Sequence, residues 1–193
     1  MRKVIVTEFV TLDGVIEDPG GGEKSKHGGW SFQFWSDDTG KYKLDEILAS
    51  GALLLGRVTY QGFAAAWPSM TDETGFADRM NSLPKFVVST TLKEVVWNNS
   101  TVLRGNIAEE VSKLKQQPGQ DILVAGSGQL VQTLRQHNLV DEYRLLVHPV
   151  VLGGGKRLFQ DGTDKSVLRL VESKTFSSGV VLLTYQPGGE KSQ

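Results

Sequence analysis

The sequence predicts an α/β protein with a mainly parallel central sheet and an antiparallel hairpin at its C-terminal end. Short apolar runs typical of buried strands end in Gly, Ser or Thr, and a helical stretch directly follows two of them. The final third instead holds two β-type runs joined by Ser177-Ser178-Gly179, which is typical of a hairpin. The length of 193 residues favours one domain, which we place at 1–186, followed by a flexible polar tail over 187–193.

The first strand, Val4 to Val10, leads into a segment of unusual composition. Thr11-Leu12-Asp13-Gly14 ends the strand with residues that favour a turn. Glu17 to Gly29 is rich in glycine and charged residues, so no regular element is expected there. Four aromatic residues then follow within Trp30 to Trp35. So much apolar surface beside a loop indicates either a lid that folds onto the protein or a surface that pads an interface.

The middle of the chain repeats one arrangement, an apolar strand followed by a helix. Leu53-Leu54-Leu55 leads through Gly56 into a helix towards Ala66, and Ile122 to Ala125 leads through Gly126-Ser127-Gly128 into another. Such repeats are typical of a parallel sheet covered by helices. The other elements we expect are strands over 85–88, 101–103 and 142–151, helices over 39–50, 108–115 and 129–136, and hairpin strands over 168–176 and 180–185.

Composition and charge exclude several classes of protein. With 21 Lys+Arg against 22 Asp+Glu the net charge is -1, which argues against a nucleic-acid binder held by phosphate contacts. The absence of cysteine excludes disulfides, thiolate metal sites and the Cys-containing zinc site of nucleobase deaminases. The three histidines lack the spacing of a metal motif, so we expect no metal site. No segment has the length and apolarity of a membrane span or signal core, so the expected location is the cytoplasm.

Two glycine-containing strand ends are candidate phosphate sites. In open α/β sheets, ligands bind beyond the carboxyl ends of the strands, where helix N-termini offer free N–H groups. At the first end Gly56 permits close approach, and Arg57 and Thr59 add a charge and a hydroxyl. At the second, Gly126-Ser127-Gly128 suits a pyrophosphate. Together they suggest a dinucleotide, but glycine at such turns is also common for steric reasons, and no G-x-G-x-x-G motif is present.

Other polar residues at strand and helix ends have two interpretations each. Ser89 and Thr90 either bind a 2′-phosphate or cap the local backbone. Asp13 either orients a polar heterocycle or relays a proton at the mouth of the crevice, or it forms a simple Asp-Gly turn. Asp37 and Asp38 either cap the following helix, or one of them supplies a carboxylate for the substrate.

The motifs, in their order along the chain, carry a family resemblance. They are Thr11-Leu12-Asp13-Gly14, Leu54 to Tyr60, Val88-Ser89-Thr90-Thr91, Val124 to Gly128, Asp141-Glu142-Tyr143, His148 to Gly155 and Leu158-Phe159. The chain resembles the dihydrofolate-reductase-like superfamily over nearly its whole length. Within it, the chain looks most like stand-alone relatives of the reductase domain that ends the bifunctional riboflavin-biosynthesis deaminase/reductase. The resemblance implies a three-layer α/β/α fold, a homodimer, and NADPH lying across the strand ends.

The resemblance also implies roles for individual residues. Asp13 matches the acidic residue on the substrate side of the riboflavin branch and is the expected catalytic residue, and Trp30 and Asp38 are the other expected substrate-binding residues. The cofactor-binding residues that it implies are Gly56, Arg57, Val58, Thr59, Ser89, Thr90, Gly126, Ser127, Gly128, Gln129 and Leu130.

The implied activity is that of an NADPH-dependent reductase, which transfers a hydride to a small pterin-like, pyrimidine-like or related heterocycle. The arginine-containing stretch with which riboflavin reductases hold a ribose phosphate has no counterpart over Leu44 to Gly51. The Trp-containing loop and helical acidic residue of folate reductases correspond only loosely to Trp30 or Trp35 and to Asp37 or Asp38. The alternative function is a non-catalytic nucleotide- or pterin-binding dimeric module on the same fold.

Overall fold

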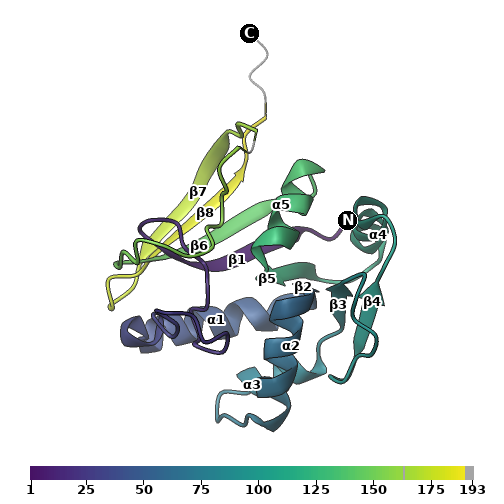
Figure 1. Ribbon diagram of the computed structural model, residues 1–193, viewed down its shortest axis with the longest axis horizontal. Coiled ribbons are helices and arrows are strands. Elements are labelled where there is room, and N and C mark those ends of the chain that lie inside the picture. The colour runs from purple at the N-terminus through teal and green to yellow at the C-terminus, as the bar shows by residue number, and fades with distance from the viewer. Residues whose placement is uncertain (163, 190–193) are drawn as a thin grey trace.

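The computed structural model describes residues 1–162 and 164–189, and its centre is an eight-stranded sheet (Figure 1). The strands are β1 (Val4–Thr11), β2 (Ser50–Gly56), β3 (Lys85–Val88), β4 (Ser100–Leu103), β5 (Asp121–Ala125), β6 (Glu142–His148), β7 (Leu168–Thr175) and β8 (Val181–Pro187). The helices are α1 (Asp37–Leu48), α2 (Arg57–Ala66), α3 (Phe76–Ser82), α4 (Ile107–Gln116) and α5 (Gly128–Gln136). Two short 3-10 helices, Phe32–Phe34 and Trp67–Ser69, lie in the connections.

The sheet is mainly parallel, as predicted. Its strand order is β4-β3-β2-β5-β1-β6-β8-β7, and all pairings from β4 to β6 are parallel. β8 pairs antiparallel with both β6 and β7, so the last two strands form the predicted hairpin at one side of the sheet. The parallel strands all end at the same edge, which we call the carboxyl edge. This is where an open α/β sheet binds its ligands.

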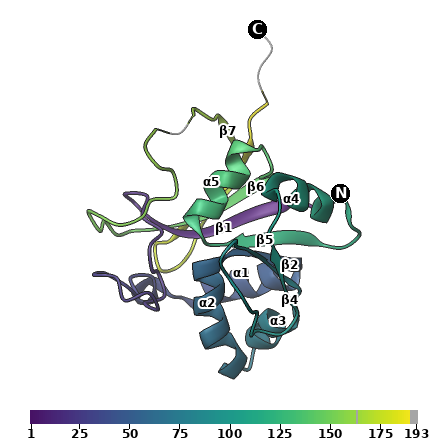
Figure 2. The same ribbon diagram turned by 45° about the vertical axis from the view of Figure 1, so that its right-hand side comes forward.

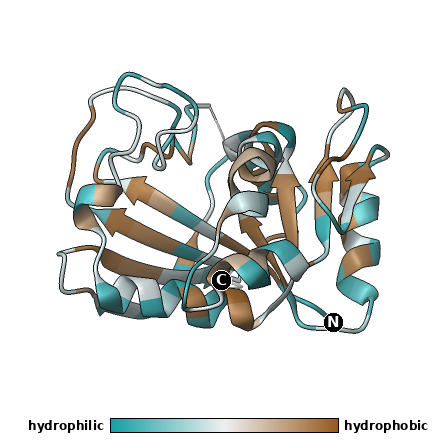
Figure 3. Ribbon diagram, turned by 90° about the horizontal axis from the view of Figure 1, so that it is seen from below, coloured by the Kyte–Doolittle hydropathy of each residue, from teal (hydrophilic) through white to brown (hydrophobic). Residues whose placement is uncertain are grey.

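Helices cover both faces of the sheet, which confirms the three layers (Figure 2). On one face α4 and α5 pack on an apolar cluster that includes Val124 and Leu134. On the other face α1, α2 and α3 pack on a second cluster around Leu53 and Leu123. In Figure 3 the strands are largely brown, and the helices alternate between brown and teal. Burial on both faces is why the parallel strands read as unbroken apolar runs.

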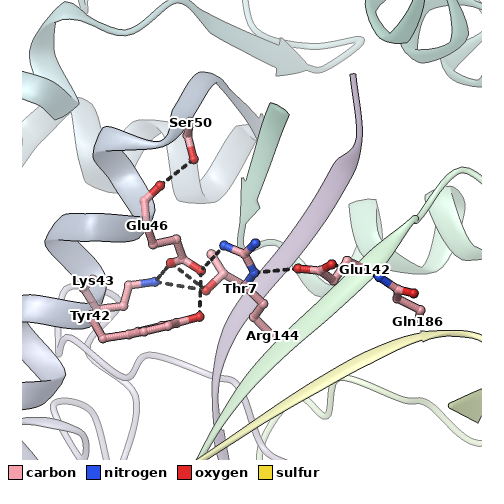
Figure 4. A network of polar contacts seen from close by, with 8 residues as sticks. All are labelled: Thr7, Tyr42, Lys43, Glu46, Ser50, Glu142, Arg144 and Gln186. Atoms are coloured by element: carbon pink, nitrogen blue, oxygen red, sulfur yellow. Dashed lines mark hydrogen bonds and ion pairs between the residues drawn. The ribbon is translucent and has the colours of Figure 1, made fainter. Parts of the chain in front are cut away.

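A buried polar network fastens α1 to β1 and β6 (Figure 4). The Glu46 side chain is 1% exposed and pairs with Lys43 and, at 3.3 Å, with Arg144 of β6. Thr7 of β1 donates a hydrogen bond to the same carboxylate at 3.1 Å, and Arg144 also pairs with Glu142 at 2.8 Å. Burial alone would raise the pKa of Glu46, but the two cations more than offset it, so this pKa lies below its ordinary value. The network balances two cations against two carboxylates and fixes the position of α1.

The helix α3 is not expected from the sequence pattern. Its seven residues are too few to display an apolar stripe of helical period. Its start is instead fixed by a residue outside the helix, because Asp72 accepts hydrogen bonds from Phe76 N at 3.1 Å and Ala77 N at 2.6 Å.

Two boundaries near the C-terminus differ from those expected. The run over 142–151 ends as a strand at His148, because Pro149 has no N–H to continue the ladder. β8 extends to Pro187, and Gly188 N donates to Val167 O at 2.8 Å, beyond the expected domain boundary at 186. Residues 190–193 of the expected tail lie outside the described residues. Across the described chain, no helix combines the length and apolarity needed to cross a membrane.

Candidate functional site

The N-termini of α2 and α5 open side by side at the carboxyl edge of the neighbouring strands β2 and β5. Gly56 and Ser127 are the N-cap residues of the two helices, and no described side chain caps either one. A Cβ built on Gly56 would lie 2.3 Å from Ser127 Oγ, and one built on Gly126 would lie 2.7 Å from Thr59 Oγ1. The two glycine turns are therefore in direct contact, with no room for a side chain on either glycine. Unpaired N–H groups and two positive dipole ends meet here, which is the arrangement that binds anions.

The other residues implied at these turns take different positions. Arg57 is exposed at the start of α2, where its Nη1 donates to Gln61 Oε1 at 2.9 Å, and no described carboxylate forms an ion pair with it. Its charge is thus free to meet an anionic ligand. Val58 is 46% exposed and Gln129 is also exposed, whereas Leu130 is 4% exposed and belongs to the core under α5.

At the end of β3 the backbone-capping interpretation accounts for the contacts of Ser89. Its Oγ accepts hydrogen bonds from Thr91 N at 3.1 Å and Leu92 N at 2.9 Å, while Thr90 is exposed. Arg104, which directly follows β4, donates to Leu92 O and so brings a guanidinium to this segment. Sequence reasoning missed Arg104, since the only signal was a basic residue placed one position after a strand.

Glu8 lies on β1 beneath the second glycine turn. Its side chain is buried, and Oε1 accepts a hydrogen bond from Gly126 N at 2.9 Å. Burial raises the pKa of Glu8 to about 8, although the hydrogen bond and the Lys43 charge act in the opposite direction. Glu8 is therefore largely protonated at neutral pH and adds little negative charge next to the anion-binding N–H groups. The sequence gives no sign of this role, because a single carboxylate within a strand reads as a break in an apolar run.

Asp13 fastens the turn after β1 to the loop after β6. Its carboxylate accepts hydrogen bonds from Thr11 Oγ1 at 2.6 Å, Leu152 N at 3.2 Å and Gly153 N at 2.8 Å. The Thr11 hydroxyl, helped by the two backbone N–H groups, lowers the pKa of Asp13 to about 2 against a small opposing effect of desolvation. The group is an anion across the neutral range and has no proton to relay. Its contacts orient the loop that contains Gly153.

A cavity of about 330 Å³ opens beside this turn, between the glycine-rich loop over 17–29 and the Gly153–Gly155 turn. Glu17, Lys26 and His27 supply its charged and polar side chains. Lys156 pairs with Glu17 at 3.1 Å, which ties the two loops together. The cavity therefore offers a polar pocket at the carboxyl edge of β1 and β6.

The aromatic block is partly buried and partly exposed. Trp30 is 5% exposed and packs edge-on against His148, with ring centroids 5.1 Å apart, while Phe9 and Phe34 contact the same imidazole at 5.1 Å and 5.9 Å. Burial lowers the pKa of His148, so its ring is neutral at pH 7. Part of the block thus folds onto the ends of β1 and β6. The exposed members of the block are Phe32 (65%) and Trp35 (53%).

Asp38 lies in the first turn of α1 and contacts the hairpin between β7 and β8. It accepts hydrogen bonds from Ser177 N at 2.8 Å and Ser177 Oγ at 2.9 Å, and from Ser36 Oγ at 2.6 Å. These donors, that of Ser36 first, lower the pKa of Asp38 to about 2. The carboxylate thus joins the helix to the hairpin. Asp13 instead contacts the loop that contains Gly153. The two carboxylates expected to bind the substrate, Asp13 and Asp38, therefore hydrogen-bond to different segments of the chain.

No group of three or more His, Cys, Asp or Glu residues within the described ranges is arranged to hold a metal ion. The site consists of N–H groups, hydroxyls, guanidinium groups and aromatic rings. These groups suit an anionic, ring-containing organic ligand.

Residues 2–182 match the family of the RibD C-terminal domain. The chain belongs to this family. Its relative YyaP from Bacillus subtilis strain 168, an uncharacterized protein, is 37% identical over 191 residues, which covers 97% of this chain and 96% of YyaP.

Solved structures share the fold at low identity. A candidate riboflavin biosynthesis protein from Shewanella sp. PV-4 aligns with a TM-score of 0.75 and 22% identity, over 97% of this chain and 99% of that one. The dihydrofolate reductase of Enterococcus faecalis, complexed with NADP(H) and RAB-propyl, aligns with a TM-score of 0.62 and 14% identity over 97% of both chains. The diaminohydroxyphosphoribosylaminopyrimidine deaminase/5-amino-6-(5-phosphoribosylamino)uracil reductase of Thermotoga maritima aligns with a TM-score of 0.65 and 17% identity, over 97% of this chain and 57% of that one. These likenesses confirm the dihydrofolate-reductase-like fold.

Proposed function

We propose that the protein is an NADPH-dependent reductase that transfers a hydride to a small pterin-like, pyrimidine-like or related heterocycle. One observation carries the proposal: the uncapped N-termini of α2 and α5 touch through Gly56 and Gly126 at the carboxyl edge of β2 and β5. A pair of such N-termini suits the two phosphates of a dinucleotide. Membership of the RibD C-terminal domain family and the likeness of the fold to a dihydrofolate reductase and a deaminase/reductase support the same proposal.

The residues at the carboxyl edge fit NADPH. Backbone N–H groups at the start of α2 and over Ser127 to Gln129 would hold the pyrophosphate, with Thr59 beside them and Arg57 adding a positive charge. Glu8 supports the second turn through Gly126 N, and its proton removes a charge that would repel phosphate. Together these groups would bind the two phosphates of a dinucleotide.

The 2′-phosphate of NADPH would lie beyond the end of β3. Thr90 offers an exposed hydroxyl there, and the Ser89 O–H remains free to donate although its oxygen already accepts two backbone N–H groups. Arg104 supplies the guanidinium that favours a phosphate over a hydroxyl. This assignment predicts that the protein prefers NADPH over NADH because of the charge of the 2′-phosphate.

Bound NADPH supplies the hydride, which an electron-poor C=N or C=O of the substrate accepts. The chain supplies position and the exclusion of water. Trp30 and its aromatic neighbours form an apolar wall at the ends of β1 and β6. Asp13 lies on the substrate side and holds the Gly153 loop against the adjacent cavity, whose Glu17 and His27 can bind the polar edge of a heterocycle. Asp38 holds the start of α1 against the turn between β7 and β8.

We also expect a homodimer in the cytoplasm. The outermost strand β7 supports the dimer, because it presents exposed apolar side chains at Leu170 (49%) and Val171 (47%), next to Val167 (63%). Exposed apolar residues along an unpaired edge are unusual for a monomer. Light scattering of the purified protein should give twice the mass of the 21.1 kDa chain, and a monomer at micromolar concentration would contradict this expectation.

Turnover is tested by a screen of pterins, pyrimidines and flavin precursors, followed as loss of nicotinamide absorbance. The proposed function predicts that at least one of these compounds oxidises NADPH faster than NADH. NADPH that binds but reduces none of these compounds would favour the non-catalytic binding module. A protein that binds neither cofactor would contradict the cofactor assignment itself.

A further inference from the structure

The edge of the sheet opposite the proposed cofactor site contains a second hollow. Its volume is about 560 Å³, and it lies where β1, β2, β3 and β5 begin. Two arginines, Arg2 and Arg79, are among its lining residues, and no Asp or Glu is. The apolar part of the wall comes from Leu83, Pro84 and Phe86. A hollow that gathers only positive charge suits an anion.

The guanidinium groups of Arg2 and Arg79 both contact Gln120. Arg2 Nε donates to the backbone oxygen of Gln120 at 2.6 Å, and Arg79 Nη2 contacts the Gln120 side-chain Oε1 at 3.5 Å. Arg79 Nη2 also donates to Ser50 O at 2.6 Å. Two like charges are thus fixed close together, which costs free energy unless a counter-charge is present.

The chain does not supply that counter-charge at contact distance. No described carboxylate lies within 4.0 Å of either guanidinium. Asp121 attracts Arg2 only from beyond that distance. The Oδ1 atom of Asp121 instead accepts a hydrogen bond from Lys3 N at 2.7 Å. The carbonyl groups that the arginines bind are neutral.

Arg2 is the stronger indication of a ligand. It is only 7% exposed, yet neither of its Nη atoms hydrogen-bonds to any residue that the structure describes. They are also not among the fully buried unpaired side-chain atoms of the described chain, so they face accessible space. Since Arg2 lines the hollow, that space is the hollow. A largely buried arginine whose two unpaired Nη groups face the hollow is arranged to receive an acceptor with several oxygens.

We propose that this amino-edge hollow is an anion site for a phosphate or a phosphomonoester. The charges of the two guanidinium groups match a doubly charged phosphate, and the two unpaired Nη groups of Arg2 supply paired donors. The wall of Leu83 and Pro84 leaves room for an apolar portion of the ligand beside them. The site is separate from the glycine turns at the carboxyl edge, and it stands whether or not the protein binds NADPH.

The test is an amide-resolved NMR titration of the purified protein with inorganic phosphate, with sodium chloride at matched ionic strength as the reference. The amides of Gly51, Ser82 and Gly119 line the hollow and serve as reporters. We expect saturable shifts at these amides with phosphate and not with chloride. Shifts no larger than those with chloride would overturn the proposal, and so would shifts confined to Gly56 and Gly126, which would assign the phosphate to the carboxyl edge.

Substitutions then assign the binding to the two arginines. Arg2→Gln and Arg79→Gln should each weaken phosphate binding by about tenfold or more, because each removes a charged donor group. Lys41→Gln is the control for the loss of one positive charge, since Lys41 lies exposed on α1 and pairs only with Asp45. If Arg2→Gln does not fold, Arg2→Lys keeps the charge but loses the paired donors, and it should bind more weakly than the wild type. Unchanged affinity in both arginine variants would overturn the proposal.

Discussion

Asp13 and Glu8 lie close together in sequence and hold opposite protonation states near neutral pH. Asp13 accepts three hydrogen bonds in partly open surroundings, and its pKa falls to about 2. Glu8 is buried with one backbone donor, and its pKa rises to about 8. The number of donors and the degree of burial decide the difference. One carboxylate therefore orders a loop as an anion, and the other supports the Gly126 turn as a neutral acid.

Substitution of Glu8 should change how stability depends on pH. Between its unfolded pKa of 4.5 and its folded value of about 8, the folded protein keeps a proton that the unfolded chain has lost. The free energy of unfolding therefore falls as pH rises through this window, by at most about 1.4 kcal/mol per pH unit from this group. Glu8→Gln removes the effect, so urea unfolding should give a flatter profile there. Parallel profiles for both proteins would contradict the assignment.

Arg57→Ala should weaken NADPH binding and narrow its preference over NADH. The side chain is exposed at an anion-binding helix start without an ion-pair partner in the described chain, so its removal takes away one charged donor. We expect a loss of roughly tenfold for NADPH and a smaller loss for NADH, because NADPH carries the larger negative charge and so loses more attraction to the removed cation; fluorescence titration measures both. Lys41→Ala, which removes an exposed cation paired only with Asp45, is the control and should change neither affinity. Equal losses for both cofactors would show that Arg57 does not contribute to the preference.

Asp13→Ala should lower turnover without a comparable loss of NADPH affinity. The carboxylate contacts Leu152 N and Gly153 N rather than the glycine turns. Misplacement of that loop should reduce turnover of an identified substrate by roughly tenfold to a hundredfold. Asp45→Ala, which removes an exposed carboxylate paired only with Lys41, should leave turnover unchanged. Full activity of Asp13→Ala would rule out this role.

At the scale of elements, the contact between the two helix starts depends on glycine. Gly126 has a φ of +62° and no space for a Cβ beside Thr59. Gly126→Ala should destabilise the protein by about 1–2 kcal/mol or more and abolish NADPH binding. Gly62 lies within α2 with open space around it, so Gly62→Ala should stabilise the helix by about 0.5–1 kcal/mol and keep binding. Urea unfolding and cofactor titration of the pair check this, and retained binding in Gly126→Ala would contradict the geometry.

Elements with strong local patterns could be predicted from the sequence, and elements fixed from a distance could not. β3 lies exactly where its apolar run lies, and α5 begins at the glycine turn, because both depend on nearby residues. α3 could not be predicted, because its N-terminus is capped by Asp72 from outside the helix. The glycine turns were visible as motifs, but only the strand order brings β2 next to β5 and so joins them.

For the same reason, the sequence could not predict the site residues whose roles depend on tertiary contacts. Glu8 matters because β5 brings Gly126 above it, and Arg104 matters because β4 ends beside the segment after β3. The burial of Trp30 depends on His148, which is more than a hundred residues away in the chain. Composition and spacing contain none of these pairings.

On the scale of the whole molecule, the parallel sheet separates two surfaces of different chemistry. The carboxyl edge gathers helix N-termini, hydroxyls and an aromatic wall, and the amino edge gathers Arg2 and Arg79 around a hollow. Two apolar clusters and the Glu46 network hold the helical layers in place between these edges. The fold thus permits a cofactor at one edge without constraining what binds at the other.

The central claim, that the carboxyl edge binds NADPH, is tested most directly by titrating the purified protein with NADPH and with NADH while following tryptophan fluorescence. Trp30, packed against His148 at the end of β6, reports on this edge. The claim predicts saturable binding that favours NADPH by tenfold or more, which is about 1.4 kcal/mol. No saturable binding of either cofactor, or equal affinity for both, would contradict it.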